Sequence, residues 1–291
     1  MLNTLNIAYL SMASLENFEC YDSLTFEPMA HYGYKVTEIP WRDEVDWSTF
    51  DYVVIRSPWD YQDDASSFLQ VLNNIEASSA QLLNPLRIIE WNINKHYLQD
   101  LASKGIPIVP TQWGENLTSA QLNATFKQFD ADELIIKPAI SANADDTYRI
   151  KRDSMDNFLQ SHAEKFMNRG YLLQPFMSAI IEEGEYSLFY FNGELSHCIL
   201  KTPKTDDFRV QEEHGGRLSL IDQPETDLVS CGQRCLEAIP ERLLYARLDF
   251  VRYDHSFVLM EAELIEPSLY FNLDADSPVR FAKAFDNFVH S

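Results

Sequence analysis

Two strand-like runs close to the carboxyl terminus, residues 246–251 and 257–264, alternate charged and apolar side chains. Successive side chains of a strand point to opposite faces of a sheet. The pattern therefore predicts a hairpin with one charged face and one face that has the composition of a buried core.

A turn at residues 254–256 places Tyr253 opposite Phe257 and sets the register of this predicted hairpin. A slip by one residue would move the charged pairs to opposite faces, so the prediction depends on that turn. In the expected register three carboxylates and one guanidinium share a face, with Asp249 opposite Glu261 and Arg247 opposite Glu263.

Carboxylates this close repel one another unless a cation lies among them, and oxygen ligands suit a hard ion such as Mg²⁺ or Mn²⁺. A solvated charged face is the alternative, because runs of charge usually face water. Val251 and Leu259 share the charged face in this register, which favours a partly buried acidic site.

Apolar runs alternate with helical patterns along the rest of the chain, which is typical of an α/β or α+β protein. We expect further strands at 6–10, 35–39, 51–55, 106–111, 132–137, 171–176, 185–191 and 194–200. We expect helices at 26–34, 68–76, 94–105, 156–166 and 227–238. The elements up to about residue 90 form a small βαβ-type layer.

The 291 residues include 23 Lys and Arg against 45 Asp and Glu, a net charge of −22. This charge repels phosphate backbones and anionic membranes, so neither nucleic acid nor a membrane is an expected partner. There is no cationic leader and no apolar stretch of about 18 residues. The four cysteines contain no CxxC pair. We therefore expect a cytoplasmic protein.

An anionic ligand would need a local group of cations against this overall charge. Lys137 and Lys201 each end an apolar run, and Lys95 begins a helical one. A lysine fixed at the end of a strand is a rigid point charge, as phosphate binding requires. Arg209 lies in a loop-like segment, and Arg56 follows a strand-like run at the edge where open α/β sheets bind ligands. Arg56 could bind a substrate carboxylate or form a surface ion pair.

The order of these residues, over positions 94–273, resembles the ATP-grasp superfamily, and within it the glutathione-synthetase and ribosomal-protein glutamate-ligase branch. DDFRVQEEHGG (206–216) resembles the Asp-Phe-Arg loop of that branch, and RLDF (247–250) with LMEAELIEPSL (259–269) resembles its metal-binding strands. The segments IRSPWDY and ELIEPSLY are also similar to the ligase of D-cycloserine biosynthesis.

The resemblance implies an ATP-grasp fold with three parts. Residues 1–90 would form an N-terminal βαβ (pre-ATP-grasp) substrate domain. Residues 91–175 would form the central ATP-grasp subdomain, and residues 176–291 the C-terminal subdomain with the metal-binding hairpin.

The resemblance also implies where ATP would bind. Lys95 and Lys137 would bind the phosphates, and Glu185, or else Glu182, would bind the ribose hydroxyls. The strap that meets the adenine base between the two lobes would consist of Gln174, Phe176 and Met177.

The reacting groups follow from the same resemblance. Lys201 and Arg209 would hold the γ-phosphate and the transferring group, and Arg247 would balance charge on the acyl phosphate. Two Mg²⁺ ions, with Mn²⁺ as the alternative, would be bound by Asp249, Glu261 and Glu263.

Two features depart from the family pattern. Glu263 stands where the family usually has Asn, and the extra charge predicts tighter metal binding or a different metal occupancy. The phosphate-covering loop, 141–147, contains no Gly, although it is often Gly-rich in the family. Backbone N–H groups approach phosphate past Ser and Ala less freely than past Gly.

The function implied is an ATP-dependent carboxylate–amine (or thiol) ligase that activates a small carboxylic or amino acid as an acyl phosphate. Loops 141–147 and 205–216 are candidates for closing over it. The alternatives are a small-molecule kinase, a non-catalytic nucleotide-binding protein and an acidic Ca²⁺-binding or structural protein. The sequence leaves the acid, the amine and the pathway open, and a homo-oligomer is possible.

Overall fold

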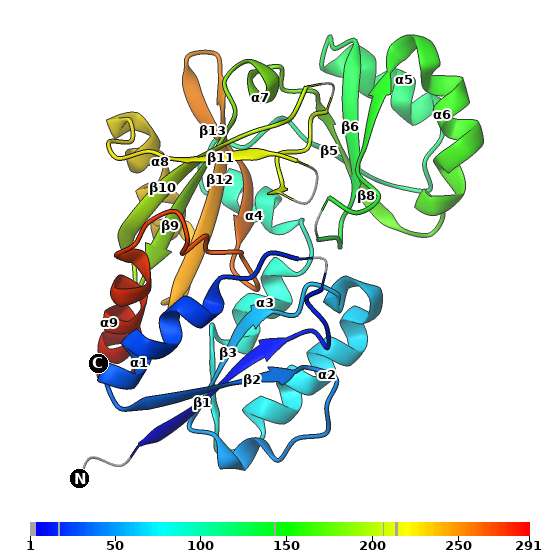
Figure 1. Cartoon of the computed structure of the whole chain (residues 1–291). Helices are drawn as coiled ribbons and strands as arrows, with labels where there is room; N and C mark the ends of the chain where they lie inside the picture. Colours follow the sequence, from blue (N-terminus) through cyan, green and yellow to red (C-terminus); the bar gives the residue numbers. More distant parts are fainter. Residues whose placement is uncertain (1–3, 17, 143, 206, 213–214) are drawn as a thin grey trace.

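The computed structural model describes residues 4–16, 18–142, 144–205, 207–212 and 215–291, and these form three β-sheets with helices packed on them (Figure 1). The strands of the three sheets lie within residues 5–83, 112–175 and 185–263. The mixed α/β and α+β class is confirmed. The domain boundaries at residues 90 and 175 stay predictions.

The N-terminal sheet is parallel, in the order β2 (Tyr34–Pro40), β1 (Leu5–Ser11), β3 (Tyr52–Ser57) and β4 (Gln81–Leu83). One face packs on the apolar side of α2 (Ala65–Glu76). The other face packs on α1 (Phe26–His31) and on α9 (Ser277–Val289), the last helix of the chain. The two ends of the sequence therefore share one core, at the lower left of Figure 1.

The central sheet is antiparallel, in the order β5 (Gln112–Glu115), β8 (Gly170–Pro175), β6 (Glu133–Pro138) and β7 (Tyr148–Lys151). Helices α5 (Ser119–Gln128) and α6 (Met155–His162) cover one face, where Leu134 and Ile136 are buried. The period of two then turns Ile135 and Lys137 of the same strand to the uncovered face. Both line the cavity described below.

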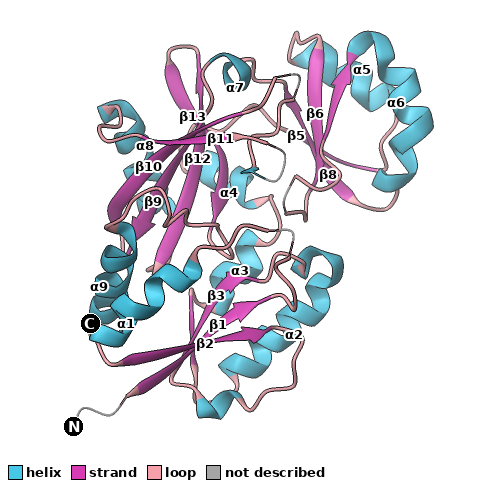
Figure 2. Ribbon diagram, viewed as in Figure 1, coloured by secondary structure: helices cyan, strands magenta, loops and turns pink. Residues whose placement is uncertain are grey.

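The C-terminal sheet has the order β11 (Arg217–Leu220), β10 (Glu194–Thr202), β9 (Glu185–Phe191), β12 (Tyr245–Tyr253) and β13 (Ser256–Glu263). Helices α3 (Leu86–Asn92), α4 (Tyr97–Ser103) and α8 (Thr226–Ala238) bury one face. On the other face α9 covers the aromatic half, and a polar half remains for the site. The short helix α7 (Ala179–Glu182) joins the central sheet to this one (Figure 2).

The hairpin predicted near the carboxyl terminus forms, and the register of its charged pairs is confirmed. Arg247 lies opposite Glu263 and Asp249 lies opposite Glu261. The alternation of charged and apolar residues was sufficient for this prediction because a slip by one residue would turn the charged side chains into the core beneath α3, α4 and α8.

The turn itself was predicted wrongly. Tyr253 pairs with Ser256, not with Phe257, because Asp254 and His255 alone form a two-residue turn with positive φ. A bulge between Asp249 and Phe250 then shifts the pairing by one residue, so that the acidic pairs lie opposite one another as predicted. As a result Leu259 packs in the core beneath the helices, and Val258 lies beside Val251 instead.

Residues 106–111 do not form the expected strand. They meet β13 through one parallel bridge, Ile108 with Leu259, flanked by two backbone hydrogen bonds. Pro107 and Pro110 lack the N–H groups that a longer ladder needs. None of the described helices is long and apolar enough to cross a membrane.

Candidate active site

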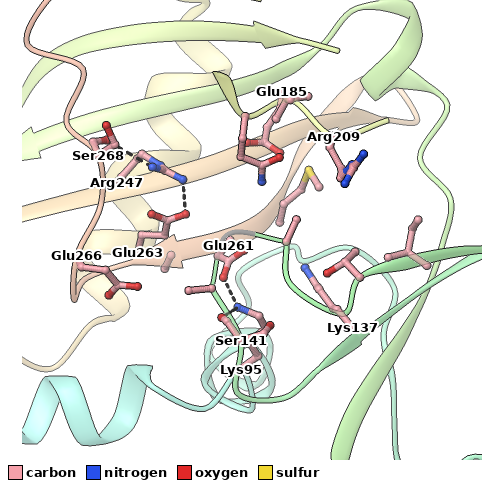
Figure 3. A pocket seen from close by; sticks show the side chains of 18 of the residues that line it. Lys95, Lys137, Ser141, Glu185, Arg209, Arg247, Glu261, Glu263, Glu266 and Ser268 are labelled. Carbon is pink, nitrogen blue, oxygen red and sulfur yellow. Dashed lines mark hydrogen bonds and ion pairs between the residues drawn. The ribbon is translucent and has the colours of Figure 1, made fainter. Parts of the chain in front are cut away.

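A cavity lies between the central sheet, the C-terminal sheet and loops of the N-terminal part of the chain, and Figure 3 shows part of its wall. The central sheet supplies Lys137 and the segment 174–177, and the C-terminal sheet supplies Glu185, Arg247, Glu261 and Glu263. The loop after β3 supplies Trp59 and Tyr61. Lys95, just before α4, completes the wall below Glu261.

Sheet register explains why the polar groups gather there. Four neighbouring strands place one polar residue beside the next: Lys201 lies opposite Glu185, Ser187 opposite Asp249, and Asp249 opposite Glu261. Residues opposite one another in an antiparallel pair have side chains on the same face. One face of β10, β9, β12 and β13 therefore carries a continuous row of charged and hydroxyl groups.

The three predicted metal ligands differ in their access to the cavity. Glu261 and Glu263 line it, and each side chain keeps 28 % of its surface exposed. Asp249 is only 3 % exposed and lies behind them, where it accepts hydrogen bonds from Ser187 and Arg247. Although burial opposes it, Arg247 and Lys201 lower the pKa of Asp249 below its usual range.

Side-chain cations now lie between these carboxylates. Lys95 pairs with Glu261, and Arg247 pairs with both Asp249 and Glu263. Within the described residues, no three acidic, His or Cys side chains converge closely enough to hold a metal ion as they stand. The donors are nevertheless all carboxylate oxygens, which suit Mg²⁺, and the Lys95 ammonium stands where a cation would sit.

Lys137 and Lys95 occupy the side of the cavity formed by the central sheet. Lys95 donates to the carbonyl oxygen of Ser141 at 3.1 Å as well as to Glu261. Lys137 is buried and forms no ion pair in the described part of the chain. Burial lowers its pKa, so a bound anion would compensate its charge.

Lys201 lies behind the cavity wall. It is 2 % exposed, and its ammonium lies 2.6 Å from Glu185 and 3.4 Å from Asp249. Glu185 does line the cavity, and burial raises the pKa of this carboxyl. Lys201 thus connects the predicted ribose ligand to the predicted metal ligand.

The predicted adenine strap lies in the wall of the cavity. It runs from the end of β8 to the start of α7, and Gln174, Phe176 and Met177 all line it. The Gln174 amide donates to Thr111 at 2.9 Å, and the Arg149 guanidinium covers Phe176 at 3.6 Å from the ring centre. Glu182, the alternative ribose ligand, is exposed and does not line the cavity.

Arg209 also reaches the cavity, from the loop after β10, where its guanidinium lies 2.9 Å from Asp207 of the same loop. The two loops expected to close over the site are described only in part. Residues 143, 206, 213 and 214 lie outside the described residues. The lining residues among the rest are Ser141, Ala142, Ala144 and Thr147 of the first loop and Phe208, Arg209, Val210 and Gln211 of the second.

Arg56 is not brought to the cavity. It is 1 % exposed, pairs with Asp22 at 2.9 Å, and donates to the carbonyl oxygen of Pro267 at 3.0 Å. Arg56 lies at the predicted edge of the sheet, but its guanidinium donates to Asp22, which is 34 positions earlier in the sequence. This long-range partner is not visible in the sequence pattern around Arg56.

Sequence reasoning did not single out Glu266, Tyr61 or Phe18, all of which line the cavity. Glu266 lies three residues beyond the end of β13, and its carboxyl group lies in the cavity beside Glu263 (Figure 3). Burial and the neighbouring Glu263 raise the pKa of Glu266 to about 8. The one available signal was a second carboxylate in ELIEP, three residues beyond Glu263.

The backbone that carries these carboxylates, residues 262–268, is held by side chains from distant parts of the chain. The Asn92 amide bonds both the carbonyl oxygen of Ala262, at 2.8 Å, and the N–H of Leu264, at 3.1 Å. Six other side chains bond the remaining positions: Tyr97, Asn84, Tyr245, Trp59, Arg56 and Arg247. The N-terminal sheet and α3 therefore fix where Glu263 and Glu266 point.

Comparison with known proteins gives a consistent result. Residues 7–84 match the family described as D-cycloserine synthetase DcsG, N-terminal domain. The chain is 29 % identical over 264 residues to the cycloserine biosynthesis protein DcsG of Streptomyces lavendulae, which covers 84 % of this chain and 85 % of that protein.

Solved structures show the same relationship. The crystal structure of D-cycloserine synthetase DcsG superposes with a TM-score of 0.86 at 26 % identity, over 98 % of this chain and 99 % of that one. The D-alanine–D-alanine ligase of Bacillus anthracis superposes with a TM-score of 0.71 at 12 % identity, over 98 % and 96 %. The resemblance to the ATP-grasp fold that the sequence suggested is confirmed.

Proposed function

We propose that this chain, which is similar to D-cycloserine synthetase and to other ATP-grasp ligases, activates a small carboxylic acid with MgATP in the cavity between its three sheets. The acid's carboxylate oxygen attacks the γ-phosphorus, ADP leaves, and an acyl phosphate forms. An amine then attacks the acyl carbon, inorganic phosphate leaves, and an amide forms. Phosphoryl transfer of this kind needs positioning and charge compensation more than covalent help.

The observation that carries the proposal is the division of charge across the cavity. Lys137 presents an uncompensated, buried ammonium on the central-sheet side. Glu261 and Glu263 present carboxylates on the opposite side. A triphosphate with a divalent cation fits this arrangement, because its anionic oxygens meet the lysine and its cation meets the carboxylates.

The nucleoside would extend from the phosphates toward the end of β8. Phe176 and Met177 offer apolar surface for the base, and backbone groups of the strap offer donors and acceptors for its edge. Glu185 faces the cavity next to the strap and would accept hydrogen bonds from the ribose hydroxyls.

Glu261, Glu263 and the buried Asp249 would hold Mg²⁺, with two ions rather than one and with Mn²⁺ as the alternative metal. Bound there, Mg²⁺ supplies neutralisation of phosphate charge. Lys95, which contacts both Glu261 and the carbonyl oxygen of Ser141, would have to leave Glu261 for the phosphates. Glu263 adds a carboxylate where the family usually has an amide.

The remaining cations have different access to the reacting groups. Arg247 lines the cavity and would balance charge on the acyl phosphate. Arg209 would need to leave Asp207 to reach the γ-phosphate. Lys201, buried between Glu185 and Asp249, would act by holding those two carboxylates in place.

We also keep three wider expectations as proposals. The partners are a small carboxylate and an amine, and neither nucleic acid nor a membrane is needed. Assembly into a homo-oligomer stays a possibility. The four cysteines are free thiols, in keeping with the cytoplasmic location expected from the sequence.

Release of ADP tests this function. The enzyme with MgATP and a panel of small carboxylic and amino acids, each with and without an amine acceptor, should release ADP with at least one acid. Glu261→Gln should lower that rate by at least about 100-fold, since charge compensation at a transferring phosphoryl group is worth several kcal/mol. Glu90→Gln, on the exposed side of α3, is the matched control.

Two outcomes would contradict the proposal. Full ADP release by a folded Glu261→Gln variant would remove Glu261 from the reaction. A stable phosphorylated product that no amine consumes would identify a kinase instead.

A further inference from the structure

The loop expected to cover the phosphates, residues 141–147, joins β6 to β7 of the central sheet and contains no glycine. Two of its residues nevertheless have positive φ, Ala144 at +56° and Asp146 at +50°. A residue with a Cβ atom adopts this conformation at a cost in free energy that glycine does not carry. Other parts of the molecule therefore have to hold the loop in this shape.

Arg169, which directly precedes β8, contacts the chain on both sides of this loop. Its Nη1 atom lies 2.7 Å from the carboxylate of Asp146, and its Nη2 atom donates to the carbonyl oxygen of Ile140 at 3.5 Å. The carbonyl oxygen of the next residue, Gly170, accepts a hydrogen bond from the N–H of Ala139 at 2.8 Å. Arg169 thus joins the residue before the loop to a residue near the loop's far end.

Asp146 is the anchor at the far end of the loop. Its carboxylate also accepts hydrogen bonds from Lys165 at 2.6 Å and from the Tyr148 hydroxyl at 3.1 Å. Although burial opposes it, Lys165 and Arg169 lower the pKa of Asp146 below its usual range. The anchor is therefore a charged carboxylate at neutral pH, which strengthens each of these hydrogen bonds.

The two cations on Asp146 differ in what else they contact. Arg169 reaches back to Ile140, whereas the hydrogen bonds of Lys165 in the described part of the chain go to Asp146 and Tyr148. Their side chains have similar exposure, 38 % for Arg169 and 49 % for Lys165. Removal of Lys165 therefore takes one ion pair from the same carboxylate but leaves the two sides of the loop joined.

The residues of this loop that line the cavity are Ser141, Ala142, Ala144 and Thr147, whereas Arg169 and Asp146 lie behind them. Arg169 can therefore act on a bound phosphate only through the shape of the loop. A loop that is already held in one shape loses less conformational freedom when a ligand binds to it.

We propose that Arg169 is a positioning residue for ATP, which holds the glycine-free loop 141–147 in its phosphate-binding shape by joining Ile140 to Asp146. This inference rests on the proposed function, because it concerns the nucleotide of the same cavity. Arg169 contacts neither the nucleotide nor the reacting atoms.

Calorimetric titration of wild type, Arg169→Met and Lys165→Met tests this role with two ligands, a non-hydrolysable ATP analogue with Mg²⁺, and adenosine. Arg169→Met should weaken binding of the analogue by at least about tenfold, because its phosphates meet a loop that is no longer held. The affinity for adenosine, which has no phosphates, should stay within about twofold. Lys165→Met should weaken binding of the analogue by less than about threefold.

Two further variants separate positioning from a loss of structure. Asp146→Asn should weaken the analogue as Arg169→Met does, and the double variant should bind it no more weakly, because both changes break one contact. The midpoints of thermal unfolding without nucleotide should stay within about 3 °C of wild type, since partly exposed ion pairs contribute little to stability.

Three results would overturn the inference. One is wild-type affinity for the analogue in Arg169→Met. A second is an equal loss in Arg169→Met and Lys165→Met, because the link to Ile140 would then have no effect. A third is an equal loss for the analogue and adenosine, which would indicate a general change in the cavity.

Failure of the proposed function looks different. A wild-type protein that binds the analogue but releases no ADP with any acid would contradict the ligase reaction, while the comparison of Arg169 with Lys165 would still stand. A wild-type protein that does not bind the analogue would contradict both.

Discussion

At the scale of single residues, the site is a set of buried charges whose partners come from neighbouring strands. The residue types could be predicted, since Lys95, Lys137, Glu185 and the acidic pair all line the cavity. What the sequence does not contain is the direction of each side chain. Lys201 was expected at the phosphate, but Glu185 and Asp249 hold it behind the wall.

His197 shows the same effect of burial on a residue outside the site. Its ring stacks on Phe189 at 4.2 Å, and its Nε2 atom donates to the carbonyl oxygen of Leu269 at 3.0 Å. Burial lowers the pKa of His197 to about 4. The ring is thus neutral in the folded protein throughout the range where an unfolded histidine gains a proton.

The sign of the pH effect follows. The folded-state pKa lies below the unfolded value of about 6.5, so the stability from neutral His197 is present above pH 6.5 and lost as the pH falls toward 4. At pH 5 the loss is about 2 kcal/mol. His197→Gln, which keeps a donor for Leu269, should remove this part of the acid sensitivity in urea unfolding at pH 7 and pH 5. An unchanged pH dependence would show that folding does not lower the pKa of His197, and His31→Gln on the exposed end of α1 is the control.

At the scale of elements, the hairpin was predictable because a period of two over a half-buried sheet permits one register. The bulge beside Phe250 could not be predicted. It depends on the two-residue turn and on the segment around Ile108, which pairs with Leu259 of β13. Short elements such as β11 and α3 were also missed. They are stabilised by contacts with distant segments rather than by a periodic pattern of their own.

The segment 262–268 is the clearest case of such long-range support. Asn92 makes two buried hydrogen bonds on either side of Glu263, and no local pattern around residue 92 or 263 reveals them. We infer that Asn92 positions Glu263, which is proposed as a metal ligand.

We expect Asn92→Ala to lower the free energy of unfolding by about 2–4 kcal/mol, because two buried backbone groups lose their partners. The concentration of Mg²⁺ needed for half-maximal ADP release should also rise several-fold, since Glu263 is held less firmly. Asn73→Ala, which removes an exposed bond on α2, should change neither quantity. A destabilised variant with an unaltered Mg²⁺ requirement would limit Asn92 to a structural role.

At the scale of the whole molecule, a chain with a net charge of −22 gathers cations inside one cavity where three sheets meet. The resemblance to ATP-grasp ligases was visible in the order of short segments, because each supplies one charged group to that cavity. The contacts that join the N-terminal sheet to the wall of this cavity could not be predicted from the sequence. Contacts such as Trp59 with Glu266 and Arg56 with Pro267 link residues more than 200 positions apart.

We propose that this cavity binds the triphosphate of ATP through Lys137 and through a divalent ion held by Glu261, Glu263 and Asp249. Calorimetric titration with a non-hydrolysable ATP analogue, with Mg²⁺ and again with excess chelator, can measure this binding. We expect the analogue to bind at least tenfold more tightly with Mg²⁺, and Glu261→Gln to lose that difference. Equal affinity in Mg²⁺ and in chelator would contradict it.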